Sequence, residues 1–504
     1  MTVDTPAWVP DAVFYQIFPD RFSASTRVPK PGRMEPWDSP PTMHGFKGGD
    51  LLGIAERLDE LTDLGVNALY LTPVFTSASN HRYHAYDYLS VDPLLGGDEA
   101  LRELLDEAHR RDIRVILDGV FNHCGRGFWQ FHHVLEQGSA SPYRDWFLLD
   151  EAVLAGEASL NAYPDRTGVD LRVGHPLGYR AWWGLPALPK FNVAHPPVRE
   201  YLLSVAEHWL RFGIDGWRLD VPAEIEDETF WHEFRQRCRS VDPDCYLVGE
   251  IWDEAPEWLV GDRFDALMNY PLGTAILGYV GGDGLDRNVI ARHDTYARMI
   301  RPLGGAAFAS RLAHLMTTYD PAVVAAQLNL IGSHDAPRAL TVLSRDRAAL
   351  RQAIVLQMTL PGAPSIYYGD EIGMEGGLDP DCRRSYPTEP GAGDLELRAF
   401  VRSLVAARRE HVALRQGEVS IAAAGERAIA IAREAGGFRA IVALNPGPDG
   451  ERLSVVRPDD ERLRPIALPG LAPVALEPSP EETAWEGART ILLPPRSAGV
   501  FLAG

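Results

Sequence analysis

Cysteine is scarce in this chain, and long apolar runs are missing. The four cysteines among 504 residues form no CxxC pair, so we expect reduced thiols and no disulfide scaffold. No apolar run approaches the ~20 residues that a membrane helix needs. The first residues show no basic segment followed by an apolar one, so no signal peptide is expected. The sequence therefore predicts a cytoplasmic protein without a membrane partner.

Positive charge is also in deficit. The chain carries 70 acidic and 49 basic residues, a formal net charge of −21. A field of that sign repels phosphate, which argues against a nucleic-acid partner and is compatible with an uncharged ligand. With 45% hydrophobic and 24% charged residues, the composition is that of a globular protein long enough for more than one domain.

Short β-branched or aromatic runs alternate with longer amphipathic segments, which indicates repeated βα units around a parallel sheet. Eight strands are predicted, at 13–18, 68–71, 114–117, 216–219, 246–248, 266–268, 327–330 and 365–368. Helices are predicted between them, among them 51–64, 99–111 and 198–212. Eight such units most economically close into a (β/α)8 TIM barrel, an α/β fold whose chemistry lies where the strands end.

Two stretches interrupt this rhythm. Residues 122–192 are rich in Gly, Pro and aromatics and are too long for an ordinary loop, so we expect a small inserted domain after strand 3. From residue 414 short alternating runs separated by turn-formers predict an antiparallel β-sandwich. The predicted domains are the first part of the barrel at 1–121, the insert at 122–192, the rest of the barrel at 193–413 and the C-terminal domain at 414–504.

Five segments carry a recognisable pattern. They read DGVFNH at 118–123, LPKFN at 188–192, GWRLDVPAE at 216–224, GEIW at 249–252 and GSHDAPR at 332–338. Their order and content resemble the α-amylase family of glycoside hydrolases (family 13). Within it they are closest to the neopullulanase, cyclomaltodextrinase and maltogenic amylase subgroup. The resemblance implies a retaining hydrolase of α-1,4-glucosidic bonds, and of α-1,6 bonds in some members. Its substrates would be maltooligosaccharides, starch, pullulan or cyclodextrins, with some transglycosylation.

By the same resemblance, three strand-end carboxylates are the catalytic groups: Asp220 the nucleophile, Glu250 the acid/base and Asp335 the third carboxylate. The physical argument agrees, because retention needs two carboxyl groups about 5–5.5 Å apart. Neighbouring strands lie ~4.8 Å apart, so side chains at two adjacent strand ends can face each other at that spacing.

The resemblance also predicts residues that bind the sugar. Arg218 lies two positions before Asp220 on the same side of the strand and should keep that carboxyl ionised. The remaining expected substrate-binding residues are His84, Tyr86, His123, Trp252, His334, Asp379 and Arg383. Tyr86 is expected to stack under the sugar. Trp182 and Trp183 are expected either to form a stacking platform or to be buried core residues.

The chain departs from the subgroup in two places. Relatives bind calcium through an Asn/Asp-rich loop after the first strand, whereas this loop reads RFSASTRVPKPGRMEP and leaves only Asp50 as a remnant. We therefore expect no metal and no cofactor, and the sequence does not support calcium. The extra β-domain that precedes the barrel in the subgroup is also not expected, which leaves monomer and homodimer both open.

Two alternative functions remain. One is an α-glucosidase or oligo-1,6-glucosidase that acts on short oligosaccharides; LPKFN argues for the neopullulanase-like group instead. The other is a non-catalytic carbohydrate-binding or scaffold barrel, against which the three retained carboxylates argue.

Overall fold

The computed structural model describes residues 3–164, 177–389, 391–456, 463–478 and 488–503. Eight parallel strands form one sheet in the order β8-β7-β6-β5-β2-β1-β10-β9. Their bounds are β1 Phe14–Ile17, β2 Ala68–Leu71, β5 Arg114–Gly119, β6 Gly216–Leu219, β7 Tyr246–Gly249, β8 Ala266–Leu267, β9 Leu328–Leu330 and β10 Ala363–Tyr367. A parallel bridge between Met268 and Leu328 joins the two outermost strands. The predicted (β/α)8 barrel is therefore confirmed, with strand positions within two residues of those expected.

The strands form from short runs of mainly apolar residues that are buried on both faces. Every residue of β1, β2, β6 and β7 is buried, as expected for parallel strands covered by helices outside and filled by side chains inside. Polar residues such as Asp220 and Glu250 follow directly after two of these strands. The end of the apolar run thus marks the edge of the sheet at which polar side chains gather.

Helices surround the barrel. The α-helices are α1 Pro19–Phe22, α2 Leu51–Ala55, α3 Leu58–Leu64, α4 Gly97–His109, α5 Trp129–Gln137, α6 Glu151–Leu154, α7 Pro196–Phe212, α8 Glu228–Val241, α9 Tyr270–Gly281, α10 Arg287–Ala291, α11 Asp294–Met299, α12 Gly305–Thr318, α13 Pro321–Ala326, α14 Ala339–Val342, α15 Arg347–Thr359, α16 Leu395–Glu410 and α17 Val412–Gln416. Gly65 and Gly213 end α3 and α7 in the left-handed conformation that a helix stop requires.

The single helix predicted over 51–64 is wrong, because the segment is broken between α2 and α3. Arg57 leaves the helical conformation there, with φ −111° and ψ 8°. Its guanidinium lies over the rings of Phe22 and Tyr386, 5.2 and 4.6 Å from their centres. Contacts with residues distant in sequence thus override the local helical pattern.

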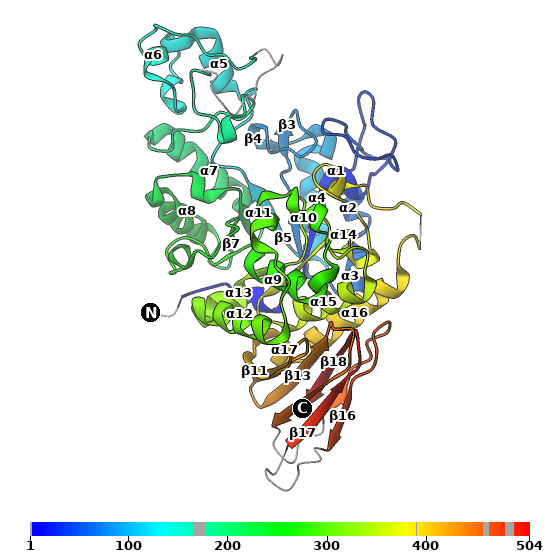
Figure 1. The fold of residues 1–504 in the computed structure, drawn as a ribbon. Helices are drawn as coiled ribbons and strands as arrows, with labels where there is room; N and C mark the ends of the chain where they lie inside the picture. The colour runs from blue at the N-terminus through cyan, green and yellow to red at the C-terminus, as the bar shows by residue number, and fades with distance from the viewer. Residues whose placement is uncertain (1–2, 165–176, 390, 457–462, 479–487, 504) are drawn as a thin grey trace.

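The segment between β5 and α7 contains α5, α6 and several isolated antiparallel bridges. His123 pairs with Lys190, Phe147 with Phe191, and Ala181 with Pro189. A separate two-stranded sheet, β3 Phe75–Ser77 with β4 Ala85–Val91, precedes this segment in the chain. Figure 1 shows α5 and α6 standing away from the barrel, above the region of β3 and β4.

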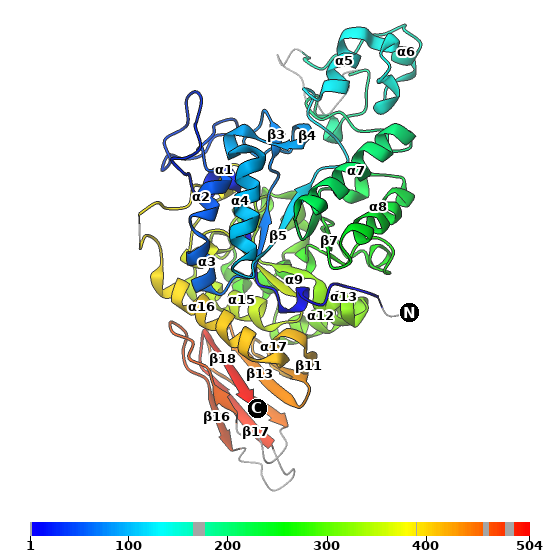
Figure 2. The ribbon, with the colours of Figure 1, turned by 180° about the vertical axis from the view of Figure 1, so that it is seen from behind.

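Two antiparallel sheets follow the barrel. One has the order β11-β12-β13-β18-β15 and the other β14-β17-β16. Their strands are β11 Glu418–Ala424, β12 Ile429–Ala435, β13 Phe438–Asn445, β14 Glu451–Val456, β15 Arg464–Pro465, β16 Ala475–Pro478, β17 Ala488–Leu493 and β18 Ser497–Ala503. The C-terminal antiparallel domain is confirmed. It lies at the opposite end of the barrel from α5 and α6, as both ribbon views show (Figures 1 and 2).

Two buried arginines join this domain to the barrel. Arg408 of α16 donates to the carbonyls of Gly362 at 2.6 Å and Leu414 at 2.8 Å. Arg433 of β12 donates to Gly417 O at 2.8 Å and also contacts the carbonyl of Thr359. Burial lowers the pKa of both guanidinium groups. Backbone carbonyls rather than carboxylates therefore solvate both charges.

Within the described ranges, none of the helices has the length and apolar composition needed to cross a membrane.

Candidate active site

Acidic side chains converge where β5, β6 and β7 end. Asp118 is in register with Arg218 across the β5–β6 pair, and Asp220 and Glu250 follow their strands directly. The backbone N–H of Asp220 donates to Gly119 O at 3.0 Å, and that of Glu250 to Leu219 O at 2.9 Å. The backbone hydrogen-bond ladder of the sheet thus continues one residue past each strand. It fixes the backbone positions from which the two carboxyl side chains extend.

The guanidinium of Arg218 lies at the centre of these carboxyl groups. Its Nη1 is 2.9 Å from Asp118 Oδ1 and 3.0 Å from Asp220 Oδ1, and its Nη2 is 2.7 Å from Glu250 Oε1. The Arg218 side chain is fully buried. One cation therefore bridges three carboxyl groups in a site with little water, where Coulomb interactions are strong.

Burial raises the pKa of both Asp220 and Glu250, and Arg218 opposes that rise. The negative charge of Glu250 further raises the pKa of Asp220. The net direction for both groups is upward, so the expectation that Arg218 keeps Asp220 ionised is wrong, because burial outweighs the effect of the guanidinium. The pair therefore retains a proton at pH values where exposed carboxyl groups are fully ionised.

Neutral groups orient the Glu250 carboxyl group. Its Oε2 accepts from the backbone N–H of Val221 at 3.2 Å, and its Oε1 from Trp252 Nε1 at 3.2 Å. Val221 holds the left-handed conformation, φ 37° and ψ 51°, which is rare for a β-branched residue. The Trp252 ring stacks on Tyr270 with centroids 3.6 Å apart.

Among the described residues no hydrogen bond reaches Oδ2 of Asp220, so that oxygen is free to react.

Asp335 has its own set of partners. Its Oδ2 is 2.9 Å from His334 Nε2, and its Oδ1 accepts from Arg383 Nη2 at 2.9 Å. Burial alone would raise the pKa of Asp335, but His334 and Arg383 outweigh it and hold this pKa well below its usual range. Arg383 also pairs with Asp379 at 2.9 Å. Asp335 is therefore a permanently ionised group, unlike Asp220 and Glu250.

The tyrosine beside the carboxyl groups is Tyr83 and not Tyr86. The Tyr83 hydroxyl donates to Asp118 Oδ2 at 2.8 Å and contacts His334, whose ring is parallel to that of Tyr83 at 4°. The Tyr86 ring instead lies against the backbone at Gly125 and Gly127, where an added Cβ would be 2.4 and 2.6 Å from it. The sequence repeats His-x-Tyr at 81–83 and 84–86, and the first copy is the one at the site.

The histidines of the two His-x-Tyr copies also differ in their surroundings. His81 belongs to the copy that lies at the site, and its pKa is lowered by burial and then by the charge of Arg383. His84 contacts His81 edge-on at 4.9 Å, and burial followed by the nearby Arg126 lowers its pKa to about 4. His123 is buried beside the Tyr83 backbone, and burial lowers its pKa to about 3. His81, Tyr83 and Asp118 were not predicted as site residues, although Asp118 lies in the DGVFNH segment.

The surroundings of Asp50 do not fit a calcium ion. Its Oδ1 accepts from Gly53 N at 2.7 Å and caps α2. Its Oδ2 is 2.9 Å from Lys30 Nζ, which also donates to Leu94 O at 2.6 Å. An ammonium thus occupies the position facing the carboxylate and would repel a second cation. No cluster of three or more His, Cys, Asp or Glu side chains suited to a metal occurs in the described parts of the chain.

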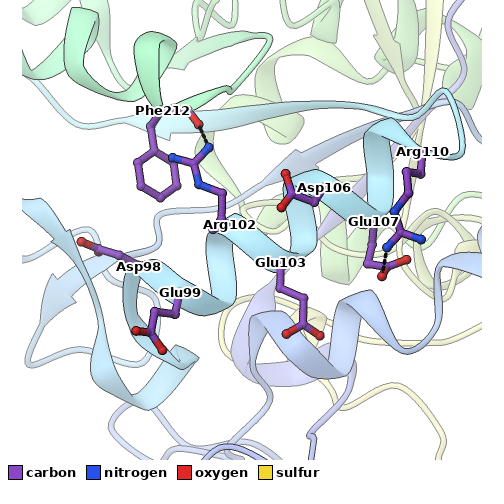
Figure 3. Close-up of a pocket in the computed structure, with 8 residues that line it drawn as sticks. All are labelled: Asp98, Glu99, Arg102, Glu103, Asp106, Glu107, Arg110 and Phe212. Atoms are coloured by element: carbon purple, nitrogen blue, oxygen red, sulfur yellow. Dashed lines mark hydrogen bonds and ion pairs between the residues drawn. The ribbon is translucent and has the colours of Figure 1, made fainter.

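A solvent-open depression on the outside of the barrel is a different feature (Figure 3). It lies between α4 and the end of α7, and its lining residues are Asp98, Glu99, Arg102, Glu103, Asp106, Glu107, Arg110 and Phe212. Arg102 donates to Phe212 O, and Arg110 pairs with Glu107. Its acidic groups have partners of their own, since Glu103 pairs with Arg27 and Asp98 accepts from the backbone N–H of Val91. In the described structure none of them contacts Arg218, so this depression is separate from the carboxyl cluster.

We predict that Arg218→Met destabilises the protein in a pH-dependent way. Without the guanidinium, the pKa values of Asp220 and Glu250 rise further above those of the unfolded chain. A carboxyl group with a raised folded-state pKa loses stabilising free energy as pH increases through that pKa. The expected cost is about 3–5 kcal/mol at pH 8 and clearly less at pH 5. Thermal unfolding midpoints at the two pH values measure it.

Arg218→Lys is the matched control, because it keeps the positive charge and loses the bridging geometry. Its destabilisation should depend less on pH than that of Arg218→Met. An equal or larger loss for Arg218→Met at pH 5 would contradict the proposed electrostatic role.

Comparison with known proteins places this chain in a family. The sequence profile described as "Alpha amylase, catalytic domain" matches residues 16–413. A cyclomaltodextrinase of Geobacillus thermopakistaniensis is 44% identical over 423 residues, which are 84% of this chain and 66% of that protein. The chain thus spans about two thirds of that relative's length. A maltogenic α-amylase and a neopullulanase are among the other similar proteins.

Solved structures match over nearly the whole chain. The protein Ttha1563 of Thermus thermophilus is 46% identical with a TM-score of 0.87, covering 98% of this chain and 99% of that one. A debranching enzyme of Nostoc punctiforme is 41% identical with a TM-score of 0.85, covering 99% and 100%. Profile, relatives and fold agree with the resemblance of the five sequence segments, and the chain belongs to the alpha-amylase family.

Proposed function

We propose that this protein is a retaining glycoside hydrolase that cleaves α-1,4-glucosidic bonds, and also α-1,6 bonds, in maltooligosaccharides and related α-glucans. The observation that carries the proposal is the guanidinium of Arg218, which holds the carboxyl groups of Asp220 and Glu250 together while Asp220 Oδ2 stays free. Their strands β6 and β7 are adjacent, which is compatible with the ~5–5.5 Å separation of retaining enzymes.

The chemistry follows from these two groups. Asp220 Oδ2 attacks the anomeric carbon, and the bond from that carbon to the glycosidic oxygen breaks. Glu250 gives its proton to the departing oxygen, which leaves as a hydroxyl. Glu250, now ionised, removes a proton from water, and the water oxygen displaces Asp220 from the glycosyl ester. The configuration at the anomeric carbon is inverted twice and so retained.

The pKa directions set Asp335 apart from Asp220 and Glu250, and the roles within that pair rest on the resemblance and on the free oxygen of Asp220. The pKa values of Asp220 and Glu250 are both raised, which favours a proton held within this pair, and the leaving group needs such a proton. Asp335 stays ionised beside His334 and Arg383 and so can bind sugar hydroxyls and favour a positively charged transition state. The Tyr83 ring, parallel to that of His334, offers an apolar face to the sugar.

The substrate class rests on charge and on the relatives. A net charge of −21 is compatible with a neutral polysaccharide. The similar proteins include a cyclomaltodextrinase and a debranching enzyme, and their names favour action on both linkages. The four cysteines are unpaired and buried, which supports a cytoplasmic location.

Chromatography of the products from maltohexaose, β-cyclodextrin and pullulan tests the function. We expect maltose and glucose from the first two and cleavage of pullulan as well. Asp220→Asn, which keeps the size of the side chain, should reduce product release by at least about a thousandfold with an unchanged unfolding midpoint. The matched control is Asp98→Asn, an exposed carboxyl group of the outer depression, which should retain full activity.

Three results would overturn parts of the proposal. Binding of maltohexaose without any release of reducing sugar would favour a non-catalytic barrel. Cleavage restricted to short α-1,6-linked oligosaccharides would favour an oligo-1,6-glucosidase. Near-normal turnover by Asp220→Asn would exclude that residue as the nucleophile.

We predict that Tyr83→Phe lowers kcat/KM on maltohexaose by about ten- to a hundredfold. The change removes only the hydroxyl that binds the Asp118 carboxylate and contacts His334. A hydrogen bond to a charged group contributes about 1.5–3 kcal/mol, which corresponds to that range.

Tyr86→Phe is the matched control, because the same hydroxyl is removed from the second His-x-Tyr copy. It should change kcat/KM by less than about twofold. If Tyr86→Phe were the more damaging of the two, the assignment of Tyr83 to the site would be wrong.

A further inference from the structure

Two adjacent tryptophans of the insert form an ordered stack that ends in solvent. The rings of Trp182 and Trp183 are parallel within 7°, with centroids 4.8 Å apart. Trp182 in turn stacks on His123 at 5.3 Å and 20°. Trp183 is 67% exposed, among the most exposed large apolar side chains of the described residues. One face of its indole ring packs on Trp182, which leaves the opposite face open.

The backbone holds Trp183 in an unfavourable conformation. Its φ of 51° and ψ of 22° are left-handed, a region that disfavours residues with a side chain. The turn is held on both sides, because Trp182 N donates to Leu188 O at 2.9 Å and Ala181 pairs with Pro189. Exposing a large apolar ring does not stabilise the fold by burial. Strain and exposure together therefore indicate a contact with a ligand.

The stack begins at the candidate active site. His123 lies next to the Tyr83 backbone, and Tyr83 binds Asp118. His123 Nε2 and the neighbouring Asn122 Oδ1 are buried without a hydrogen-bond partner in the described part of the protein. The stacked rings of His123, Trp182 and Trp183 thus run from beside the Tyr83 backbone to the open face of Trp183. A glucose unit bound on that face would therefore be a different unit of the chain from the one that His123 contacts.

We propose that the open face of Trp183 binds a second glucose unit of the α-glucan chain, outside the sugar that is cleaved. The flat C–H face of a pyranose ring packs on an indole without needing charge, which suits an uncharged chain. This subsite rests on the proposed hydrolase function and deepens it. Trp183 acts through affinity for longer chains, while Asp220 and Glu250 act on the bond.

The test compares two substrates that differ in length. In Trp183→Ala, kcat/KM on maltohexaose should fall about tenfold, mainly through KM, because roughly 50 Å² of apolar contact is lost. On p-nitrophenyl α-D-glucoside, which has one sugar, it should change less than about twofold. Trp183→Phe retains a flat ring and should restore most of the maltohexaose rate. Trp129→Ala, at a tryptophan of the insert that is 61% exposed, is the control and should leave both rates unchanged.

Binding separates this inference from the hydrolase proposal. In the Asp220→Asn background, which is expected not to turn over, Trp183→Ala should weaken the calorimetric Kd for maltohexaose about tenfold. Trp183→Gly should weaken it equally and leave the thermal unfolding midpoint no lower than that of the parent, since glycine accepts the left-handed backbone.

Three results would overturn the subsite. These are an unchanged Kd in both variants, an equal loss of activity on the one-sugar and six-sugar substrates, or a clear fall in the midpoint for Trp183→Gly. Any of them would leave Trp183 as a structural residue or as the contact of a protein partner. Absence of all cleavage by the wild type would overturn the hydrolase proposal and not the binding result.

Discussion

The buried guanidinium of Arg218 is the interaction on which the rest of the site depends. Three carboxyl groups, from Asp118, Asp220 and Glu250, lie within 3.0 Å of it. Without a cation, three carboxylates gathered in a buried site would repel one another and would take up protons as a result. The strand register places Arg218 beside Asp118 and two residues before Asp220. The strand register of the barrel therefore determines which charged groups meet at the site.

Separate cations give the carboxyl groups different states. Burial raises the pKa values of Asp220 and Glu250, and Arg218, which is shared by three carboxyl groups, does not offset that rise. Asp335 is paired with Arg383 and His334 and stays ionised. A carboxyl pair that favours holding a proton and a fixed negative charge thus arise from the same chemical group through unequal surroundings. The insert adds aromatic rings beside this centre, and the Lys30 ammonium occupies the position facing Asp50.

The strands could be predicted from sequence because each is an apolar run that ends near a polar residue, whereas Asp220, Glu250 and Asp335 were predicted from the resemblance of their segments to a known family. The predicted residues Arg218, Trp252, His334, Asp379 and Arg383 all contact this cluster or one another. Tyr83 was missed because two adjacent His-x-Tyr copies look alike, and only the packing of Tyr86 on Gly125 and Gly127 distinguishes them. The break at Arg57 was missed because the aromatic rings that hold it are distant in sequence.

Trapping of the covalent intermediate tests the central claim most directly. A slow fluorinated substrate, 5-fluoro-α-D-glucosyl fluoride, should leave one glycosyl group on the protein, and peptide mass mapping should locate it on Asp220. Arg218→Lys should accumulate less of this adduct, since the free oxygen of Asp220 loses its fixed position. A label on Glu250 or Asp335, or cleavage of maltohexaose without any trapped adduct, would contradict the account.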